Sequence, residues 1–397
     1  SNIDDMGTII FLFLILTQFY GYMGLQGLPF MLTTHVGILV LGVFLGYKKG
    51  NLFNKYLIMM VVSLILCAIS SKVYRNQSFI SSLYASLFIL DIFFYYFLVY
   101  LNVGVKRFEK VLVILIVATC LGFILQHLFF PKIIFFASAG EWISLSATPH
   151  RFIQITAQSL ISLGIFLGFN KFLELKNKLY AILSFVCFVC ILIRGFRIML
   201  LAAIVSLIWI LYKYNKTIFS IKNILKIAGV LLMFSFSLLI PVVQESIGNM
   251  VLRQTVENNT LDNQDYARTI QLAYYFGEHF KNTIEFFLGS GLPGNSPYGL
   301  YISEELPAIG INWVDWGLLG LSWLGGVPLV ICMLLYMIKC IWLTRYSRKN
   351  RYISAWFIYL LIISVTHPEV YQFGSMLVQG MVLYLVLRLK KTGLLDN

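Results

Sequence analysis

Long apolar runs separated by short polar connections extend along most of the chain. Each run approaches the roughly 20 residues that a helix needs to cross about 30 Å of hydrocarbon at about 1.5 Å per residue. Helices are expected because every backbone polar group in a bilayer must be satisfied within the protein. The pattern predicts an all-α polytopic membrane protein with about 12 transmembrane helices, at about 7–23, 30–47, 56–71, 80–102, 111–127, 154–170, 179–193, 198–212, 227–243, 315–338, 353–366 and 373–389.

Basic residues fall mainly in alternate connections between these runs. Most of the 30 Lys and Arg residues lie within 48–55, 106–110, 171–178, 213–226, 339–351 and 388–391. The positive-inside rule places these connections in the cytoplasm, and an even number of spans then places both termini there. The exceptions lie on the other side and are mostly arginine, which suits bidentate binding of phosphate: Lys72, Arg75, Lys132, Arg151, Arg194, Arg197, Arg253, Arg268 and Lys281.

Two of the predicted outer connections are long, and the rest of 1–397 is expected to form a single transmembrane domain. Segment 128–153 is aromatic and apolar, ends at His150-Arg151, and is expected to lie at the membrane interface. Segment 244–314, between the ninth and tenth predicted helices, holds nine of the 17 acidic residues if Asp315 at its edge is included. Within it an amphipathic helix is predicted to begin near Arg268 and to end at the glycine-rich stretch 288–294. Its expected apolar face is Ile270, Ala273, Gly277, Phe280, Ile284 and Phe287.

Composition agrees with this membrane architecture. Hydrophobic residues make up 59% of the chain and charged residues 12%, and the mean hydropathy of +0.83 excludes an ordinary soluble domain. The net charge of +13 is what the positive-inside rule leaves behind, so no nucleic-acid partner is expected. Six cysteines lie in or beside apolar runs, and no His/Cys cluster has zinc spacing. We therefore expect neither a metal nor a cofactor.

The turn Arg194-Gly195-Phe196-Arg197 separates two apolar runs and has two interpretations. Both guanidinium groups could extend toward water and cap the flanking helices. Alternatively, two guanidinium groups on so short a turn could hold the two phosphates of a diphosphate, because partial desolvation strengthens charge-assisted hydrogen bonds. Arg268 also has two interpretations: it could form a weak surface ion pair, or it could contribute to the same diphosphate site.

Several ionisable residues on the predicted outer side could act as a general base toward a hydroxyl group. The candidate catalytic residues are His367, Glu369, Asp315 and His150, and the turn at His367-Pro368-Glu369 concentrates two of them. Glu304 and Glu305 are further possibilities. Asp91 lies near the middle of a predicted span, where a carboxylate could pair with an arginine, line a lipid path or relay a proton.

Three segments together resemble the superfamily of O-antigen polymerases and O-antigen ligases, which are GT-C-like membrane enzymes. These are Arg194–Leu201 on the short turn, Arg268–Gly294 in the large loop, and Asp315–Gly326 entering a span. Isoleucine-, phenylalanine- and tyrosine-rich chains of this length resemble the polymerases more than the ligases. The resemblance implies a metal-independent glycosyltransferase of the bacterial cytoplasmic (inner) membrane, with an extracytoplasmic active site, that makes O-antigen, capsule or a related polysaccharide.

The same resemblance implies partners and residue roles. Undecaprenyl-diphosphate-linked oligosaccharide would be both donor and acceptor, membrane lipid would surround the chain, and a chain-length regulator protein could associate. The diphosphate-binding residues would be Arg194, Arg197, Arg268, Arg253 and Arg151, with Arg197 and Arg268 matching the family's motifs. Some members have a glycine eleven positions after an arginine in both large loops. Here Ser162 and His279 hold those positions.

Two alternatives remain open from the sequence. A ligase differs only in its acceptor, lipid A core in place of another repeat unit. A flippase for lipid-linked oligosaccharides, or another transporter, would also have about a dozen spans. Transporters of that kind are built from related halves with short connections, whereas the long loop 244–314 has no counterpart in the first half of this chain. This difference favours an enzyme.

Overall fold

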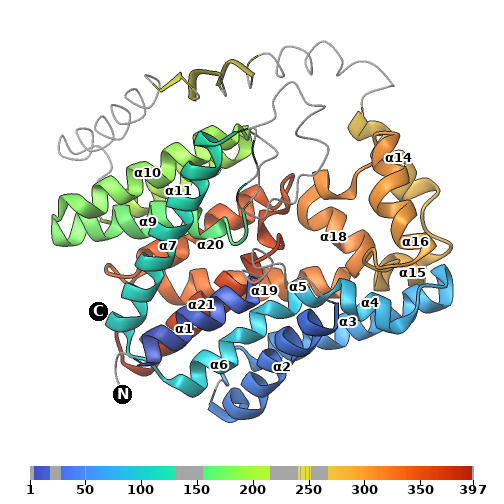
Figure 1. The fold of residues 1–397 in the computed structure, drawn as a ribbon, viewed down its shortest axis with the longest axis horizontal. Helices are drawn as coiled ribbons and strands as arrows, with labels where there is room; N and C mark the ends of the chain where they lie inside the picture. Colours follow the sequence, from blue (N-terminus) through green and yellow to red (C-terminus); the bar gives the residue numbers. More distant parts are fainter. Residues whose placement is uncertain are drawn as a thin grey trace.

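The fold is described from a computed structural model (Figure 1). It describes residues 4–17, 28–49, 51–130, 155–214 and 267–395, with isolated positions at 132 and 134 and between 240 and 251. Within these ranges every regular element is a helix, so the predicted all-helical class is confirmed for the described part of the chain.

The described helices form two groups along the chain, one up to residue 214 and one from residue 267 onward, and the second group begins within the predicted loop 244–314. The first group is α1 (Asp4–Leu16), α2 (Leu28–Gly46), α3 (Asn54–Arg75), α4 (Phe79–Ala85), α5 (Leu87–Leu90), η3 (Asp91–Phe93), α6 (Phe94–Leu101), α7 (Val105–Leu128), α9 (Ser159–Leu175), α10 (Lys178–Arg194) and α11 (Arg197–Tyr214). The second group is α14 (Ala267–Gly277), α15 (Thr283–Leu288), α16 (Pro297–Leu300), η5 (Tyr301–Glu305), α17 (Leu306–Ala308), η6 (Trp313–Trp316), α18 (Gly317–Gly325), α19 (Val327–Thr344), α20 (Arg351–Ile363), η7 (Pro368–Val370) and α21 (Ser375–Lys391).

Three of the described helices, α3, α7 and α19, are long and apolar enough to cross a membrane. The bent pair at 79–101 would be a fourth if it forms one span. Others are shorter apolar helices, and the predicted run 227–243 lies mostly outside the described residues. The count of 12 spans and the extent of the two outer loops therefore remain predictions.

Two predicted continuous spans are interrupted in the structure. The run 80–102 bends by 51° and passes through the 3-10 turn η3, where the buried Asp91 pairs with the buried His35 of α2. The partner of Asp91 is thus a histidine, where an arginine had been one expectation. The run 315–338 breaks at Gly326, whose φ of 93° separates α18 from α19. Left-handed backbone at this position favours glycine.

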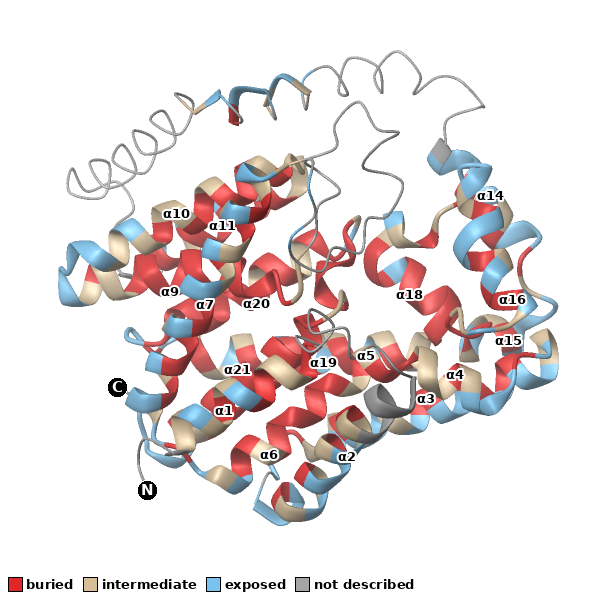
Figure 2. Ribbon diagram, in the orientation of Figure 1, coloured by how far each residue is buried: buried red, intermediate tan, exposed pale blue. Residues whose placement is uncertain are grey.

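The helix α21 forms the centre of the fold. Its residues from Ser375 to Leu387 are buried, and it contacts α6, α7, α9 and α19. Around it, α9 packs on α10, α11 on α20, and α3 on α19 (Figure 1). Figure 2 shows buried residues on the inner sides of these helices and exposed residues on their outer sides. One continuous hydrophobic cluster runs through the described bundle.

Five of the six basic connections that the sequence assigns to one side lie next to one another, and the sixth, 213–226, lies mostly outside the described residues. Lysine side chains bridge them by donating to backbone carbonyls or by pairing with Glu109, and an asparagine adds a further link. The contacts are Lys391 Nζ to Lys49 O (2.9 Å), Lys339 Nζ to Leu52 O (2.7 Å), Lys171 Nζ to Glu109 (2.9 Å) and Asn170 Nδ2 to Lys349 O (2.9 Å). These connections therefore form one end of the bundle.

The loop helix predicted from Arg268 begins where expected, but it is not continuous. It is divided into α14 and α15 by the segment 278–282. The face that packs on the protein carries the buried Gln271 and Tyr275, and the Tyr275 ring stacks on Trp323 at 4.2 Å. The expected apolar face points outward, because Ile270 is 41% exposed and Ile284 60% exposed. Periodicity identifies the apolar face of a helix without identifying what that face contacts.

Candidate functional site

The predicted turn between two helices is present at Arg194–Arg197. The helix α10 ends at Arg194, and Gly195 follows it with φ 68° and donates its backbone N–H to Leu192 O at 3.0 Å. A left-handed glycine after the last helical residue is a common way to end a helix. The next helix, α11, begins at Arg197. The turn brings the two arginines to the same end of the bundle.

The Arg194 side chain turns inward and pairs with Glu369. Its Nη1 lies 3.0 Å from Glu369 Oε2, and both side chains are buried. The Glu369 carboxylate also accepts hydrogen bonds from Ser162 Oγ (2.9 Å) and Tyr359 Oη (3.4 Å). The Trp356 indole N–H in turn donates to Ser162 Oγ at 3.0 Å. Glu369 is therefore the counter-ion of Arg194. Because its carboxylate oxygens already accept hydrogen bonds from three side chains, it is a poor general base.

Arg194 keeps two unused hydrogen-bond donors in this buried site. Its Nε and Nη2 have no hydrogen-bond partner, although the side chain is only 2% exposed. A buried donor without an acceptor costs about 1–3 kcal/mol. The guanidinium also lies over the Phe196 ring, 5.8 Å from its centroid. An anion that reached this arginine would supply the missing acceptors.

His367 lies against the same turn. Its ring meets the Phe196 ring edge-on at 4.6 Å, and its Nδ1 accepts the backbone N–H of Glu369 at 3.1 Å. Because Nδ1 is the acceptor, the hydrogen of the neutral ring is on Nε2. Burial, together with the positive charge of Arg194, holds the pKa of His367 well below its usual value. The neutral ring is thus prepared to donate a hydrogen bond from Nε2, and its arrangement does not favour the predicted role as a base.

Asp315 lies on a segment that packs beside the His367 turn. Leu318 donates its N–H to Ser364 O at 2.8 Å, and Tyr371 Oη donates to Gly317 O at 3.1 Å. A side chain at Gly317 would overlap Ser364 O, so the close approach requires glycine. The Asp315 side chain still reaches solvent. It is therefore accessible, whereas Glu369 is fully buried.

Arg268 acts on Asp315 from the start of α14. Crowding by protein atoms raises the pKa of Asp315, while Gln271 and the positive charge of Arg268 partly offset that rise. Gln271 also ties α14 to η6, because its Oε1 accepts the indole N–H of Trp316 at 2.8 Å. The Arg268 side chain itself is exposed. The loop helix thus carries an arginine to the same end of the bundle as Asp315.

The structure brings together Arg194, His367 and Glu369 in direct contact, with Asp315 on an adjacent segment and Arg268 beside it. Arg197, three residues after Arg194 and at the start of α11, is partly exposed. The remaining candidates, His150, Arg151 and Arg253, lie outside the described residues. Among the residues that the structure describes, no group of three or more His, Cys, Asp or Glu side chains is arranged to hold a metal ion.

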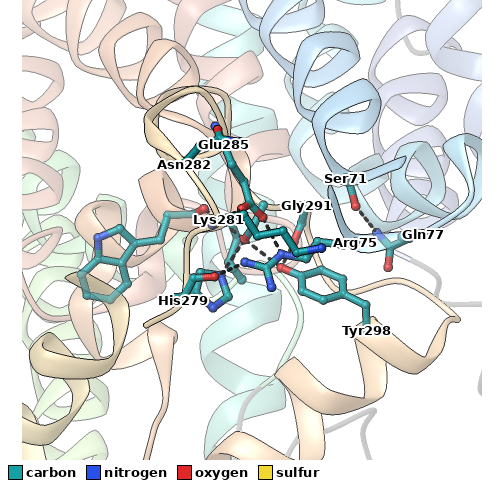
Figure 3. A network of polar contacts seen from close by, with 12 residues as sticks. Ser71, Arg75, Gln77, His279, Lys281, Asn282, Glu285, Gly291 and Tyr298 are labelled. Atoms are coloured by element: carbon teal, nitrogen blue, oxygen red, sulfur yellow. Dashed lines mark hydrogen bonds and ion pairs between the residues drawn. The ribbon is translucent and has the colours of Figure 1, made fainter. Parts of the chain in front are cut away.

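A second polar network, which the sequence did not predict, attaches the large loop to α3 (Figure 3). Arg75, at the end of α3, donates from Nε to Glu285 Oε1 at 2.5 Å and from Nη2 to His279 O. Glu285 also accepts the Lys281 N–H at 2.7 Å. His279 Nε2 lies 2.8 Å from Ser290 Oγ, so the network extends into the glycine-rich segment. From the sequence, Arg75 was only one of the basic residues that lie outside the predicted cytoplasmic connections.

The glycine-rich segment caps the broken end of α18. The N–H groups of Ser290 and Gly291 donate to Trp323 O and Leu324 O at 3.0 and 2.9 Å. A Cβ on Gly289 would meet the backbone of Leu324 and Gly326. The glycines here therefore permit a close approach of the backbone to α18.

Ser162 and His279, the two positions where the chain departs from the superfamily's arginine–glycine spacing, each belong to one of these networks. Ser162 binds Glu369, and His279 binds Ser290. No family model, no curated protein and no solved structure matches the chain.

Proposed function

We propose that the chain is a membrane-embedded polysaccharide polymerase that transfers a growing glycan from undecaprenyl diphosphate to an incoming lipid-linked repeat unit. The observation that carries this proposal is the convergence of Arg194, His367 and Glu369 at one end of the bundle, with two donors of the buried Arg194 unused. Unused donors in a dry site favour an anionic ligand.

The sidedness of the molecule supports an active site away from the cytoplasm. The described basic connections lie at one end of the bundle. The positive-inside rule places that end on the cytoplasmic side of the bacterial inner membrane. Because successive helices run in opposite directions, the turns at Arg194 and His367 then lie at the opposite end of the bundle. Both termini would be cytoplasmic in this arrangement.

The chemistry follows from the residue types. An acceptor hydroxyl attacks the anomeric carbon of the donor, the bond from that carbon to the diphosphate oxygen breaks, and a new glycosidic bond forms. Arg194, Arg197 and Arg268 stabilise the charge that develops on the leaving diphosphate, and His367 Nε2–H can add a neutral donor. Asp315 takes the proton of the hydroxyl, a role that its raised pKa suits.

Purified protein incubated with undecaprenyl-diphosphate-linked repeat units tests this function. A ladder of lengthened products is expected, and Arg197→Ala should abolish it without removing the protein from the membrane. Lys72→Ala removes an exposed charge from α3 and should leave the ladder intact. Transport of intact repeats across a liposome without a ladder would identify a flippase, and transfer only to lipid A core would identify a ligase.

A further inference from the structure

The helix α3 presents a continuous apolar stripe outward. The stripe residues, spaced three or four apart along one side of a helix long enough to cross a membrane, are Ile58, Val62, Ile65, Ile69 and Val73, with exposures of 42, 49, 38, 48 and 65%. Such a stripe on a spanning helix is expected to face lipid, because exposure of apolar side chains to water is unfavourable in free energy. The stripe reaches the last turn of α3, where Arg75 lies.

The helix α15 is fixed against that last turn and has an exposed apolar face of its own. Its Glu285 is fully buried and pairs with Arg75 at 2.5 Å (Figure 3). On its outer face Ile284 is 60% exposed and Phe287 50% exposed, one helical turn apart. Lys281 is exposed just before the helix. A second exposed apolar surface therefore lies on the loop, next to the end of α3.

The helix α14 also exposes apolar side chains. Its inward face carries Gln271 and Tyr275, and its outward side carries Ile270 and Phe276, which are 41 and 57% exposed. A helix on a water-facing domain normally buries its apolar face and exposes its polar one. Figure 1 shows α14 running across the direction of α3, and Figure 2 shows its exposed outer face. The Phe276 and Phe286 rings, 6.1 Å apart, join the two helices.

We propose that α14 and α15 lie in the outer interface of the membrane, with Ile270, Phe276, Ile284 and Phe287 in contact with lipid. Interfacial helices place apolar side chains about 5–10 Å into the boundary between headgroups and acyl chains. The Arg75–Glu285 pair fixes α15 at the level where α3 leaves the bilayer, and Lys281 is placed to meet lipid phosphates. This inference requires α3 to cross a membrane but does not depend on the polymerase activity.

Spin labels on the full chain in phosphatidylethanolamine–phosphatidylglycerol vesicles test the proposal. Ile284→Cys and Phe287→Cys place labels on the outer face, and Asn295→Cys places one on an exposed polar loop as the matched control. The native cysteines are buried. Oxygen, which concentrates among acyl chains, should relax the labels at 284 and 287 several-fold more than a water-soluble nickel chelate does. The order should reverse at 295.

Two outcomes would overturn the proposal. Labels at 284 and 287 that respond like the label at 295 would place this face in water, and labels shielded from both relaxants would show that protein covers it. As a measurement without a spin label, Phe287→Trp should show fluorescence that phospholipids brominated on the acyl chain quench, above the quenching of the unsubstituted chain. Equal quenching of the two proteins would contradict lipid contact.

Discussion

Replacing both members of the Arg194–Glu369 pair should separate a structural role from a functional one. Glu369→Leu alone leaves the guanidinium buried without its counter-ion, and Ser162 and Tyr359 lose their shared acceptor. Breaking a buried ion pair from one side costs about 3–5 kcal/mol. Arg194→Met alone leaves the carboxylate uncompensated and should cost a similar amount. The double variant replaces the pair by apolar groups, which is usually neutral or stabilises by about 1–4 kcal/mol.

The assay is the free energy of unfolding, from titration of the detergent-solubilised protein with sodium dodecyl sulfate, measured beside polymer formation. We expect both single variants to be destabilised, and the double variant to recover stability without recovering activity. A double variant as unstable as the sum of the single changes would contradict an isolated ion pair. A double variant that is both stable and active would refute the anion-binding role of Arg194.

Three further predictions concern proton, metal and backbone. The pKa of His279 is lowered from 6.5 to about 3 by burial and by Arg75, so the unfolded chain takes the proton first on acidification. The free energy of unfolding should therefore fall by about 2 kcal/mol between about pH 7 and pH 5, a loss that should be absent from His279→Gln. Polymer formation should survive EDTA treatment, and loss of activity that a divalent cation restores would contradict the metal-free mechanism. Gly326→Ala should lower the melting temperature, because its φ of 93° and the adjacent Leu288 carbonyl exclude a side chain, whereas Gly277→Ala has open space and should not.

The sequence predicted the local features of the site well. The two helices around Arg194-Gly195-Phe196-Arg197 were expected within a few residues of their observed ends, because a glycine turn between two apolar runs is a local signal. The partner of Arg194 was not predictable, since Glu369 is 175 residues away and side-chain pairing depends on how distant helices pack. Glu369 was therefore predicted as a candidate catalytic residue with no indication that it pairs with Arg194.

The break at Gly326 was missed for a similar reason. Hydropathy is continuous from 315 to 338, and the residues that make the break tolerable lie elsewhere in the chain. Ser290 and Gly291 supply the donors that the end of α18 would otherwise lack. The pattern identified the apolar face of α14 without its direction, because periodicity does not show what a face contacts.

Chain growth proceeds from the N-terminus, so the cap of α18 is synthesised before the helix that it caps. Residues 289–291 precede Trp323 and Leu324 by about thirty positions. When α18 forms, donors for its last carbonyls already exist, and the helix can end in surroundings poor in water without exposing them. A lengthened or shortened segment between 292 and 316 would leave every capping residue in place and still delay or prevent their meeting. Correct assembly of this end of the protein therefore depends on the order and spacing of synthesis as well as on the contacts finally made.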